Sequence, residues 1–352
     1  MKVLITGGAG FIGQHLARRL VAADHDVIAL DNLLGQVHLD PSASRAAFPG
    51  TVIEADVADA EAWSSVPDVD AVVHLAAETG TGQSMYEVER YRRVNVGGTE
   101  VVGSSAARRG IPVVSLSSRA VYGEGRHTCP DHGTTFGTPC CDLAAPKASR
   151  EGDEHRPVSV YGETKSEGEA VLATVADGIP VTTIRPQNVI GPGQALHNPY
   201  TGVLAAFLAM LREGKPLTVY GAGTQTRDFI HVEDLAAVIQ WALDHPADPG
   251  SPRVLNAGSG VRTTLVELAS HAASGAPVPT HGITHLEVHR AGDIEHACAD
   301  LTVLRSLGAP EPRWSTRDAV ADFVARSWDQ PGAPATAWDE ALGELEERGL
   351  TS

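Results

Sequence analysis

Short apolar runs recur along the first half of the chain, and longer amphipathic segments separate them. Segments such as Gly13–Ala23 and Gly97–Arg109 space their apolar residues as helices do. Strands that alternate with helices predict an α/β fold with a doubly wound parallel sheet, and right-handed crossovers place helices on both of its faces. The predicted strands are Lys2–Thr6, Asp26–Leu30, Val52–Glu54, Ala71–Leu75, Pro112–Leu116 and Val181–Ile184.

The pattern loosens after about Arg185, where Gly and Pro become frequent. We expect a smaller α/β region there, over the carboxyl edge of the sheet, with Asp228–Leu243 returning to the main domain as a strand and helix. The predicted division is residues 1–180 plus about 226–254 for the main domain, and about 181–225 plus 255–330 for the smaller region. Residues 331–352 form a C-terminal tail, whose acidic helix Asp339–Arg348 we expect to be solvated or loosely docked.

Composition narrows the class of protein. No apolar run approaches the roughly 18 residues of a membrane span, and the start MKVLITGG turns glycine-rich too early for a signal peptide. We therefore expect a cytoplasmic protein, in which its four cysteines stay reduced. A formal net charge of −17 argues against a general partner among nucleic acids or anionic membranes.

The first strand runs directly into the sequence TGGAGFIG. Its glycines Gly7, Gly10 and Gly13 are spaced G-x-x-G-x-x-G where a helix begins. The first permits a sharp turn, the second lets the backbone approach a pyrophosphate, and the third allows close packing of helix on strand. The positive end of the helix dipole would attract the phosphates. The motif therefore predicts a Rossmann-type dinucleotide site.

An acidic residue follows at the end of the second strand. A carboxylate at Asp31 can bind both hydroxyls of an adenine ribose and repels a 2′-phosphate, so we predict NAD rather than NADP. Asp56 and Val57 end the third strand near the expected adenine, and His74–Ala77 ends the fourth with small residues. For Asn95, a structural role and a cofactor contact are equally open. The expected cofactor contacts are Gly7, Gly10, Phe11, Ile12, Gly13, Asp31, Asn32, Asp56, Val57, Leu75, Ala76, Ala77, Asn95, Tyr161, Lys165 and Pro186.

Tyr161 and Lys165 lie four residues apart and would share one face of a helix. A phenol with a pKa of about 10 is a poor base at neutral pH, but the ammonium and the positive nicotinamide ring of NAD would favour the phenolate. Tyr161 is therefore a candidate general base. Ser118 ends the fifth strand, at the edge where open α/β sheets bind ligands, and would hold the substrate hydroxyl.

Several motifs occur in order over roughly residues 1–300: TGGAGFIG, HLAA, SSRAVYG, YGETK, RPQNVIGPG and RDFIHVEDLA. In them the chain resembles the extended short-chain dehydrogenase/reductases, in the NAD-dependent nucleotide-sugar epimerase/dehydratase branch. The resemblance implies that Ser118, Tyr161 and Lys165 are catalytic, that the smaller region binds a nucleotide-diphosphate sugar, and that the protein is a homodimer packed through helices. A finer resemblance, in AAETGTGQSMYEVERY and SSRAVYGEG, is to dTDP-L-rhamnose 4-epimerase-like proteins and implies a 6-deoxyhexose.

The same resemblance implies contacts with the substrate. Asn188 in RPQN and the arginines in TRDFIH and HRAGD match residues that meet a sugar diphosphate, and the planar fork of arginine suits phosphate oxygens. A surface ion pair is the alternative for each arginine. Residues 78–84 follow the fourth strand and should face the sugar. The expected substrate contacts are Thr79, Gly80, Ser118, Arg119, Asn188, Arg227, Arg290 and Asp293.

The two residues after Ser118 separate the reactions of this branch. By resemblance, 4,6-dehydratases carry Asp-Glu there, whereas decarboxylases carry a glutamate and 3,5-epimerases a cysteine at the second position. This chain has Arg119 and Ala120. We therefore predict an epimerase that inverts carbon 4 through a 4-keto sugar, with NAD taking and returning the hydride.

Two other functions share part of this pattern. An NAD(H)-dependent nucleotide-sugar 4-ketoreductase or dehydrogenase would use almost the same residues, but it would release its cofactor in each cycle. A non-enzymatic NAD-binding sensor or scaffold commonly lacks the tyrosine or the lysine, and both are present here.

The insert before Tyr161 holds a separate cluster of residues. Cys129, His132, Cys140 and Cys141 could gather as metal ligands. Their spacing departs from the spaced pairs of a tetrahedral site, and the alternative is a surface loop with free thiols. From the sequence we assign no metal.

Overall fold

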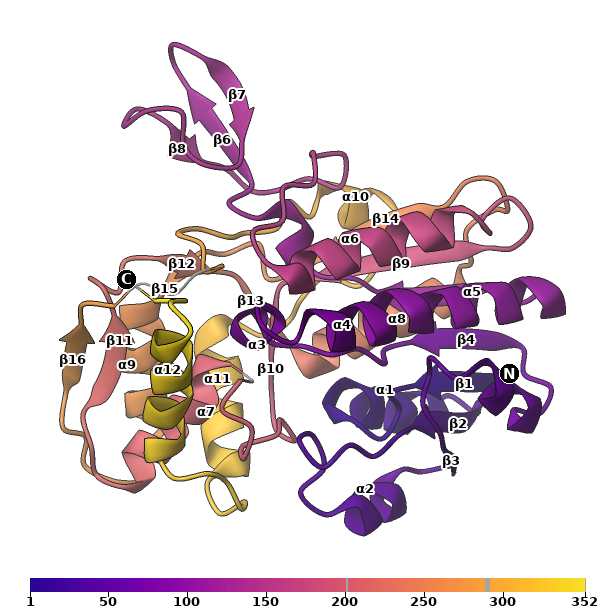
Figure 1. Cartoon of the computed structure of the whole chain (residues 1–352), viewed down its shortest axis with the longest axis horizontal. Coiled ribbons are helices and arrows are strands. Elements are labelled where there is room, and N and C mark those ends of the chain that lie inside the picture. Colours follow the sequence, from indigo (N-terminus) through magenta and orange to yellow (C-terminus); the bar gives the residue numbers. More distant parts are fainter. Residues whose placement is uncertain (201, 289–291, 352) are drawn as a thin grey trace.

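The computed structural model describes residues 1–200, 202–288 and 292–351. Within these residues a seven-stranded parallel sheet has the order β14–β9–β5–β4–β1–β2–β3 (Figure 1). The strand order reverses at β1, which is the switch point of a doubly wound sheet. The strands are β1 (Lys2–Thr6), β2 (Asp26–Asp31), β3 (Thr51–Glu54), β4 (Ala71–His74), β5 (Val113–Leu116), β9 (Val181–Pro186) and β14 (Arg253–Ala257). The predicted fold class is confirmed.

The remaining elements flank this sheet or lie beyond its carboxyl edge. The α-helices are α1 (Phe11–Ala22), α2 (Pro41–Ala47), α3 (Thr81–Ser84), α4 (Val88–Tyr91), α5 (Gly98–Arg109), α6 (Val160–Ala173), α7 (Val203–Arg212), α8 (Val232–Asp244), α9 (Leu265–Gly275), α10 (Thr302–Ser306), α11 (Thr316–Ser327) and α12 (Thr336–Glu347). Two 3₁₀ turns are η1 (Ala60–Ser65) and η3 (Arg119–Tyr122), and η2 (Arg92–Gly97) is a π-helical turn. The other strands are β6 (Arg126–Cys129), β7 (Gly133–Phe136), β8 (Ala145–Pro146), β10 (Asn188–Ile190), β11 (Leu217–Tyr220), β12 (Thr226–Arg227), β13 (Phe229–His231), β15 (Thr263–Thr264) and β16 (Ile283–Leu286).

Alternate residues of β1 face opposite layers of the main domain. Val3 and Ile5 pack in one buried cluster with apolar residues of α1 and α8. Leu4 packs in another cluster with residues of α5 and α6. Because successive side chains of a strand point to opposite faces, this apolar strand needs helices on both sides of the sheet. In the part of the chain described, no helix is both long and apolar enough to cross a bilayer.

The smaller region has a core of its own, beside the carboxyl edge of the sheet (Figure 1). Phe207 of α7, Leu268 of α9 and Phe323 of α11 are completely buried in it. The main sheet extends further along the chain than the sequence suggested. All five residues of β14 pair with β9, so the boundary predicted at about residue 254 falls inside a strand. The apolar run in β14 is short, and its strand character depends on its neighbour β9.

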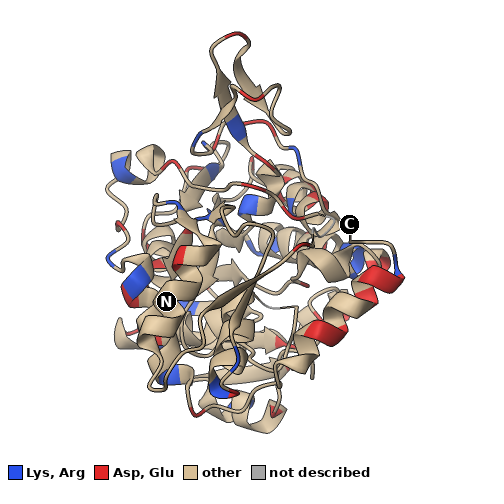
Figure 2. Ribbon diagram, turned by 90° about the vertical axis from the view of Figure 1, so that its left-hand side faces the viewer, with Lys and Arg blue, Asp and Glu red and all other residues tan. Residues whose placement is uncertain are grey.

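The C-terminal helix α12 is docked on the smaller region and carries acidic residues on its exposed surface (Figure 2). Leu345 is its buried contact. Glu344 accepts a hydrogen bond from the hydroxyl of Tyr200, and the Arg348 guanidinium lies 4.1 Å from the centre of the Tyr86 ring. These contacts attach the tail beside α3, the segment that follows the fourth strand.

Strands β6, β7 and β8 form a small antiparallel sheet that projects from the body of the molecule (Figure 1). We call residues 126–146 the arm. It corresponds to the cysteine-containing insert of the sequence, and it follows directly on η3 at the edge of the main sheet.

Candidate active site

A cavity of about 1090 Å³ runs along the carboxyl edge of the sheet, between the main domain and the smaller region. Among the described residues, its lining contains every predicted cofactor contact except Asn95. It also contains five of the predicted substrate contacts, namely Thr79, Gly80, Ser118, Arg119 and Asn188. The sequence motifs therefore meet at one site.

The glycine-rich turn is closely packed, and side chains would not fit in it. Gly7 has a φ of +66°, and a Cβ atom there would lie 2.8 Å from the backbone of Ala76. A Cβ atom on Gly13 would lie 2.4 Å from the carbonyl oxygen of Gly8. Gly10 precedes the first turn of α1, and no side chain caps the N–H groups at the start of this helix. The turn therefore presents the N-terminus of α1 to the cavity, where it can bind a pyrophosphate.

Asp31 is a buried carboxylate at the end of β2. Its oxygens accept hydrogen bonds from the backbone N–H groups of Ala9, at 3.0 Å, and Leu33, at 2.9 Å. The Nε2 atom of His38 lies 3.4 Å from the same carboxylate. A carboxylate can accept about four hydrogen bonds, so the fixed Asp31 retains capacity for ribose hydroxyls. His38 also lines the cavity and was missed, because no motif surrounds it.

Asn95 corrects one predicted contact. Its amide donates to the carbonyl oxygen of Glu78, at 3.1 Å, and to Thr164 Oγ1, at 3.0 Å, and its Oδ1 accepts from the N–H of Glu78, at 2.8 Å. This residue is not part of the cavity lining, and it ties the segment after β4 to the helix α6, which carries Tyr161 and Lys165. It is a positioning residue, which is the structural role that the sequence left open.

Ser118, Tyr161 and Lys165 all line the cavity. Ser118 caps the turn η3, where its Oγ accepts the N–H of Ala120 at 3.1 Å. The Nζ atom of Lys165 donates to the carbonyl oxygen of Leu116, at 3.0 Å, which fixes the lysine against the end of β5. The Oγ atom of Ser84 accepts the N–H of Tyr161, at 3.0 Å, so α3 is attached to the start of α6.

The electrostatics around Tyr161 involve one cation that the sequence analysis did not name in this role. Burial raises the pKa of the Tyr161 phenol, and a hydrogen bond with Ser118 and the positive charge of Arg119 oppose that rise. Burial lowers the pKa of Lys165 to about 8. Arg119 is thus a further cation that acts on Tyr161, beside the Lys165 ammonium and the nicotinamide ring of NAD that the sequence analysis named. The pKa of Arg119 is itself lowered to about 10, first by burial and then by the charge of Arg227.

Four of the described residues that line the cavity hold a buried polar atom that lacks a protein partner. Among the described residues, Ser117 Oγ, Gln187 Oε1, Gln194 Oε1 and His197 Nε2 are buried without a hydrogen bond, and all four residues line the cavity. Buried polar groups are almost always paired in proteins, so these atoms keep hydrogen-bonding capacity for water or for a polar ligand. These atoms could not be predicted from sequence patterns, because serine, glutamine and histidine occur in many roles.

The predicted diphosphate clamp is not assembled as expected. Arg227 is buried, and its guanidinium binds Asp293 at 2.5 Å and also the carbonyl oxygens of Thr226, Ile294 and Glu295. Among the described residues the cavity lining includes neither Arg227 nor Asp293. Arg227 therefore forms an ion pair in the structure, but a buried one and not the surface pair that the sequence analysis kept as the alternative. Arg290 lies outside the described residues.

Known proteins match this chain over nearly its whole length. The model of the NAD dependent epimerase/dehydratase family matches residues 3–258. The dTDP-L-rhamnose 4-epimerase of Burkholderia thailandensis is 37% identical, over 94% of this chain and 96% of that protein. The UDP-glucose 4-epimerase of Mycolicibacterium smegmatis is 29% identical, over 92% of this chain and 97% of that protein.

The fold also matches solved structures of such enzymes. The UDP-glucose 4-epimerase from Thermotoga maritima with UDP-glucose superposes with a TM-score of 0.77 at 26% identity, over 93% of this chain and 98% of that one. The Thermus thermophilus UDP-glucose 4-epimerase complex with NAD gives 0.78 at 25% identity, over 94% of this chain and 100% of that one. With the glycine turn, Asp31 and the Ser118, Tyr161 and Lys165 cluster in one cavity, these matches lead to one conclusion: the chain belongs to the NAD-dependent epimerase/dehydratase family.

Proposed function

We propose that the protein is an NAD-dependent epimerase that inverts carbon 4 of a nucleotide-linked hexose. The observation that carries the proposal is the gathering of Ser118, Tyr161 and Lys165 on the wall of one large cavity, with Ala120 beside them. Ala120 has no acid or base to offer, so elimination of water from the sugar has no proton donor at this position. Reversible oxidation of a sugar hydroxyl needs only the three residues and the cofactor.

The residues at one end of the cavity fit NAD. The turn Gly7–Gly13 would receive the pyrophosphate, because added side chains would clash there and the N–H groups of α1 face the cavity. Asp31 would bind the hydroxyls of the adenine ribose. Lys165 donates one of its three N–H groups to Leu116 and would use the others on the nicotinamide ribose. NAD supplies a hydride acceptor that can return the hydride to either face of the oxidised sugar.

The chain's own residues then handle the proton of the reaction. Tyr161, as phenolate, takes the proton of the sugar 4-hydroxyl, while Ser118 donates a hydrogen bond to the same oxygen. The positive charge of Arg119 stabilises the phenolate until the proton moves. The 4-keto sugar turns over within the cavity, and Tyr161 returns the proton to the oxygen of the inverted product. Thr79 and Gly80 line the cavity and would contact the ring. The hydroxyl of Tyr91 lies 2.6 Å and 3.0 Å from their carbonyl oxygens and holds this segment in place.

For the substrate we propose a dTDP-linked 6-deoxyhexose. The support is the 37% identity to the dTDP-L-rhamnose 4-epimerase of Burkholderia thailandensis, which exceeds the 29% found with UDP-glucose 4-epimerases. The unpartnered polar atoms of Gln187, Gln194 and His197 are candidate ligands for the nucleotide or the diphosphate. We also propose the homodimer and the cytoplasmic location that the sequence analysis predicted, and a sizing column with light scattering tests the dimer.

A panel of dTDP- and UDP-linked hexoses tests the function. Each sugar is incubated with the purified protein, and products of unchanged mass are separated by chromatography and identified by NMR. We expect one pair of C4 epimers to interconvert to equilibrium from both sides, without net change of NADH absorbance. Stoichiometric consumption of NADH with a 4-keto sugar would instead identify the ketoreductase, and an inactive protein that binds NAD would identify the sensor.

A further inference from the structure

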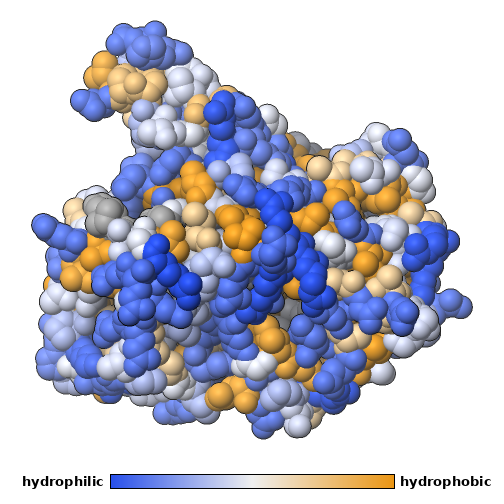
Figure 3. Space-filling model, viewed as in Figure 1, coloured by the Kyte–Doolittle hydropathy of each residue, from blue (hydrophilic) through white to orange (hydrophobic). Residues whose placement is uncertain are grey.

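The arm has almost no core of its own. Figure 3 shows it standing clear of the rest of the surface. His127 and Cys129 are buried in β6, but every residue from 130 to 146 is exposed or only partly buried. So small a sheet buries too little apolar surface to offset the entropy of ordering it, and small units of this kind usually depend on disulfides or metals.

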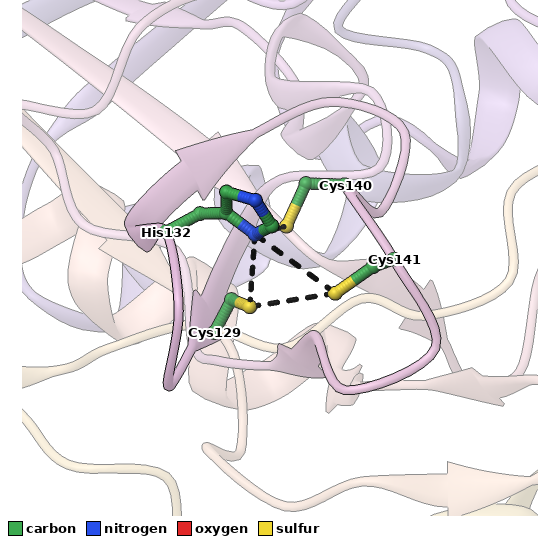
Figure 4. Close-up of side chains that lie close together, drawn as sticks. All are labelled: Cys129, His132, Cys140 and Cys141. Carbon is green, nitrogen blue, oxygen red and sulfur yellow. Dashed lines mark hydrogen bonds between the residues drawn. The ribbon is translucent and has the colours of Figure 1, made fainter.

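Four metal-binding side chains converge inside this arm. Cys129 ends β6, His132 lies in the turn before β7, and Cys140 and Cys141 lie in the loop before β8; Figure 4 shows them pointing toward one another. Their ligand atoms all lie within 4.8 Å of one another. The Nδ1 atom of His132 is 3.3 Å from Cys129 Sγ, 3.5 Å from Cys140 Sγ and 4.0 Å from Cys141 Sγ.

The shorter of these distances lie near the edges of a metal-centred tetrahedron, and the longest separation, of up to 4.8 Å, would contract on binding an ion. With bonds of about 2.3 Å to sulfur and about 2.0 Å to nitrogen, tetrahedral zinc places its ligand atoms roughly 3.5–3.8 Å apart. The distance of 3.4 Å between Cys129 Sγ and Cys141 Sγ falls close to that range. It is well beyond a disulfide bond of about 2.05 Å. Since three of the residues come from two separate loops, their convergence reflects the folded arm rather than sequence spacing alone.

We propose that Cys129, His132, Cys140 and Cys141 bind one structural Zn²⁺ ion that holds the arm together. Three sulfurs and one imidazole form one of the usual ligand sets of structural zinc sites, and thiolates favour zinc over calcium, magnesium or manganese. Four protein ligands fill a tetrahedron and leave no position for a substrate, so the ion would be structural and not catalytic. Binding releases the three thiol protons to solvent. Cys140 and Cys141 are adjacent in the sequence, which departs from the spaced pairs of a tetrahedral site. In the folded loop both of their sulfur atoms nevertheless reach the cluster.

The zinc ion would fix the arm at one end while the body of the protein fixes the other. At the base, Arg126 forms an ion pair with Asp153, and the N–H of Lys147 donates to the carbonyl oxygen of Arg126 at 2.8 Å. Just before the arm, the carboxylate of Glu124 accepts the N–H of Glu295 at 2.9 Å. The site therefore lies outside the catalytic cavity, and it stabilises a projection rather than the reacting groups.

Metal analysis of the full-length protein tests the proposal directly. Protein purified without chelator from zinc-supplemented cells should contain about one zinc per chain by plasma mass spectrometry. Cys129→Ser and Cys141→Ser should each reduce the zinc content at least tenfold. Cys298→Ser is the matched control, because Cys298 is a buried thiol outside the arm, and this variant should keep its zinc. After removal of zinc, protease should cut between residues 130 and 146, and added Zn²⁺ should restore protection.

Cobalt gives a readout that does not require a folded variant. Metal-free wild-type protein titrated with Co²⁺ should develop the visible bands of tetrahedral cobalt and the ultraviolet band of thiolate-to-cobalt charge transfer, with saturation at one equivalent. Zinc below about a tenth of an equivalent together with no tetrahedral cobalt spectrum would overturn the proposal. A mass lower by two hydrogen atoms, with a peptide linking Cys129 to Cys141, would also overturn it by showing a disulfide.

Discussion

The wall of the catalytic cavity and the arm lie next to each other in the chain, but they are held in different ways. The wall consists of strand ends and the helix α6, which pack on the apolar layers of the main sheet. Ser118 in this wall is itself buried. The arm starts four residues after η3 ends, and all of its residues except His127 and Cys129 are exposed or only partly buried. The buried core holds the reactive groups of the wall in place, whereas the arm depends on contacts among its own side chains.

The two regions therefore position their reactive side chains by different means. In the wall, hydrogen bonds such as the one from Lys165 to Leu116 place a titratable group where it is dehydrated, and burial then shifts its pKa. In the arm, thiols lie close together near the surface without such a core. A change in the wall should therefore affect catalysis first, and a change in the arm should affect local order first.

Replacement of the phenol that we propose as the general base should give the largest effect. Tyr161→Phe removes the proton acceptor but keeps the ring that packs at the start of α6, so kcat should fall by about 10²–10⁴. Binding of NAD, measured by calorimetry, should change little, and zinc content in the arm should not change. Activity within a few-fold of wild type would show that Tyr161 is not the base.

Loss of the neighbouring cation should have a smaller effect that depends on pH. The positive charge of Arg119 lowers the pKa of Tyr161, so Arg119→Met should raise that pKa. The rising limb of the plot of kcat against pH should move up by about one pH unit, and kcat at pH 7 should fall about tenfold. Arg119→Lys keeps the charge and is the matched control. An unchanged rising limb in Arg119→Met would show that Arg119 only binds substrate.

The main domain should also respond to acid, through a buried histidine at the end of β4. His74 bonds Thr6 at 2.8 Å and Thr99 at 3.0 Å, and burial, with the charge of Lys165, lowers its pKa to about 3. The unfolded chain takes up this proton near pH 6.5 and the folded chain does not, so stability falls as pH drops from 6.5 toward 3. The free energy of unfolding should fall by up to about 1.4 kcal/mol per pH unit more in wild type than in His74→Gln. Equal slopes in urea unfolding between pH 6.5 and 5 would contradict this.

Changes in the arm should have the smallest effect on turnover. Cys141→Ser should increase proteolysis within residues 130–146, while kcat/KM changes by less than about threefold, because local opening need not spread to the core. The measurement compares cleavage rates and activity in the same preparation, with Cys298→Ser as the control. A loss of activity as large as that of Tyr161→Phe would show that the order of the wall depends on the order of the arm.

The same contrast explains what could be predicted from the sequence. Strands such as Lys2–Thr6 are apolar and short, and the glycines after them have one demanding geometry, so the sheet and the cofactor turn could be predicted from local pattern. Ser118, Tyr161 and Lys165 could be predicted because their motifs fix both spacing and element. The pairing of Arg227 with Asp293 could not, because the two residues are far apart in sequence and either one could have faced the ligand.

The arm shows the second limit of sequence patterns. The spacing of Cys129, His132, Cys140 and Cys141 gave no decisive signal, and only the pairing of β6 with β7 and β8 brings the two loops together. The unpartnered atoms of Gln187 and His197 could not be predicted either, because burial without a hydrogen-bond partner is a property of the folded chain. Patterns thus predict elements and motifs, whereas contacts between loops need the structure.

Turnover of a substrate labelled with deuterium at carbon 4, in ordinary water, tests the central claim most directly. If Tyr161 moves only the hydroxyl proton while the hydride leaves and returns within the cavity, the C4 epimer should retain its deuterium completely, with no net NADH formed. Loss of the label to solvent during epimerisation would contradict the account, because it would mean that carbon 4 is deprotonated and not oxidised.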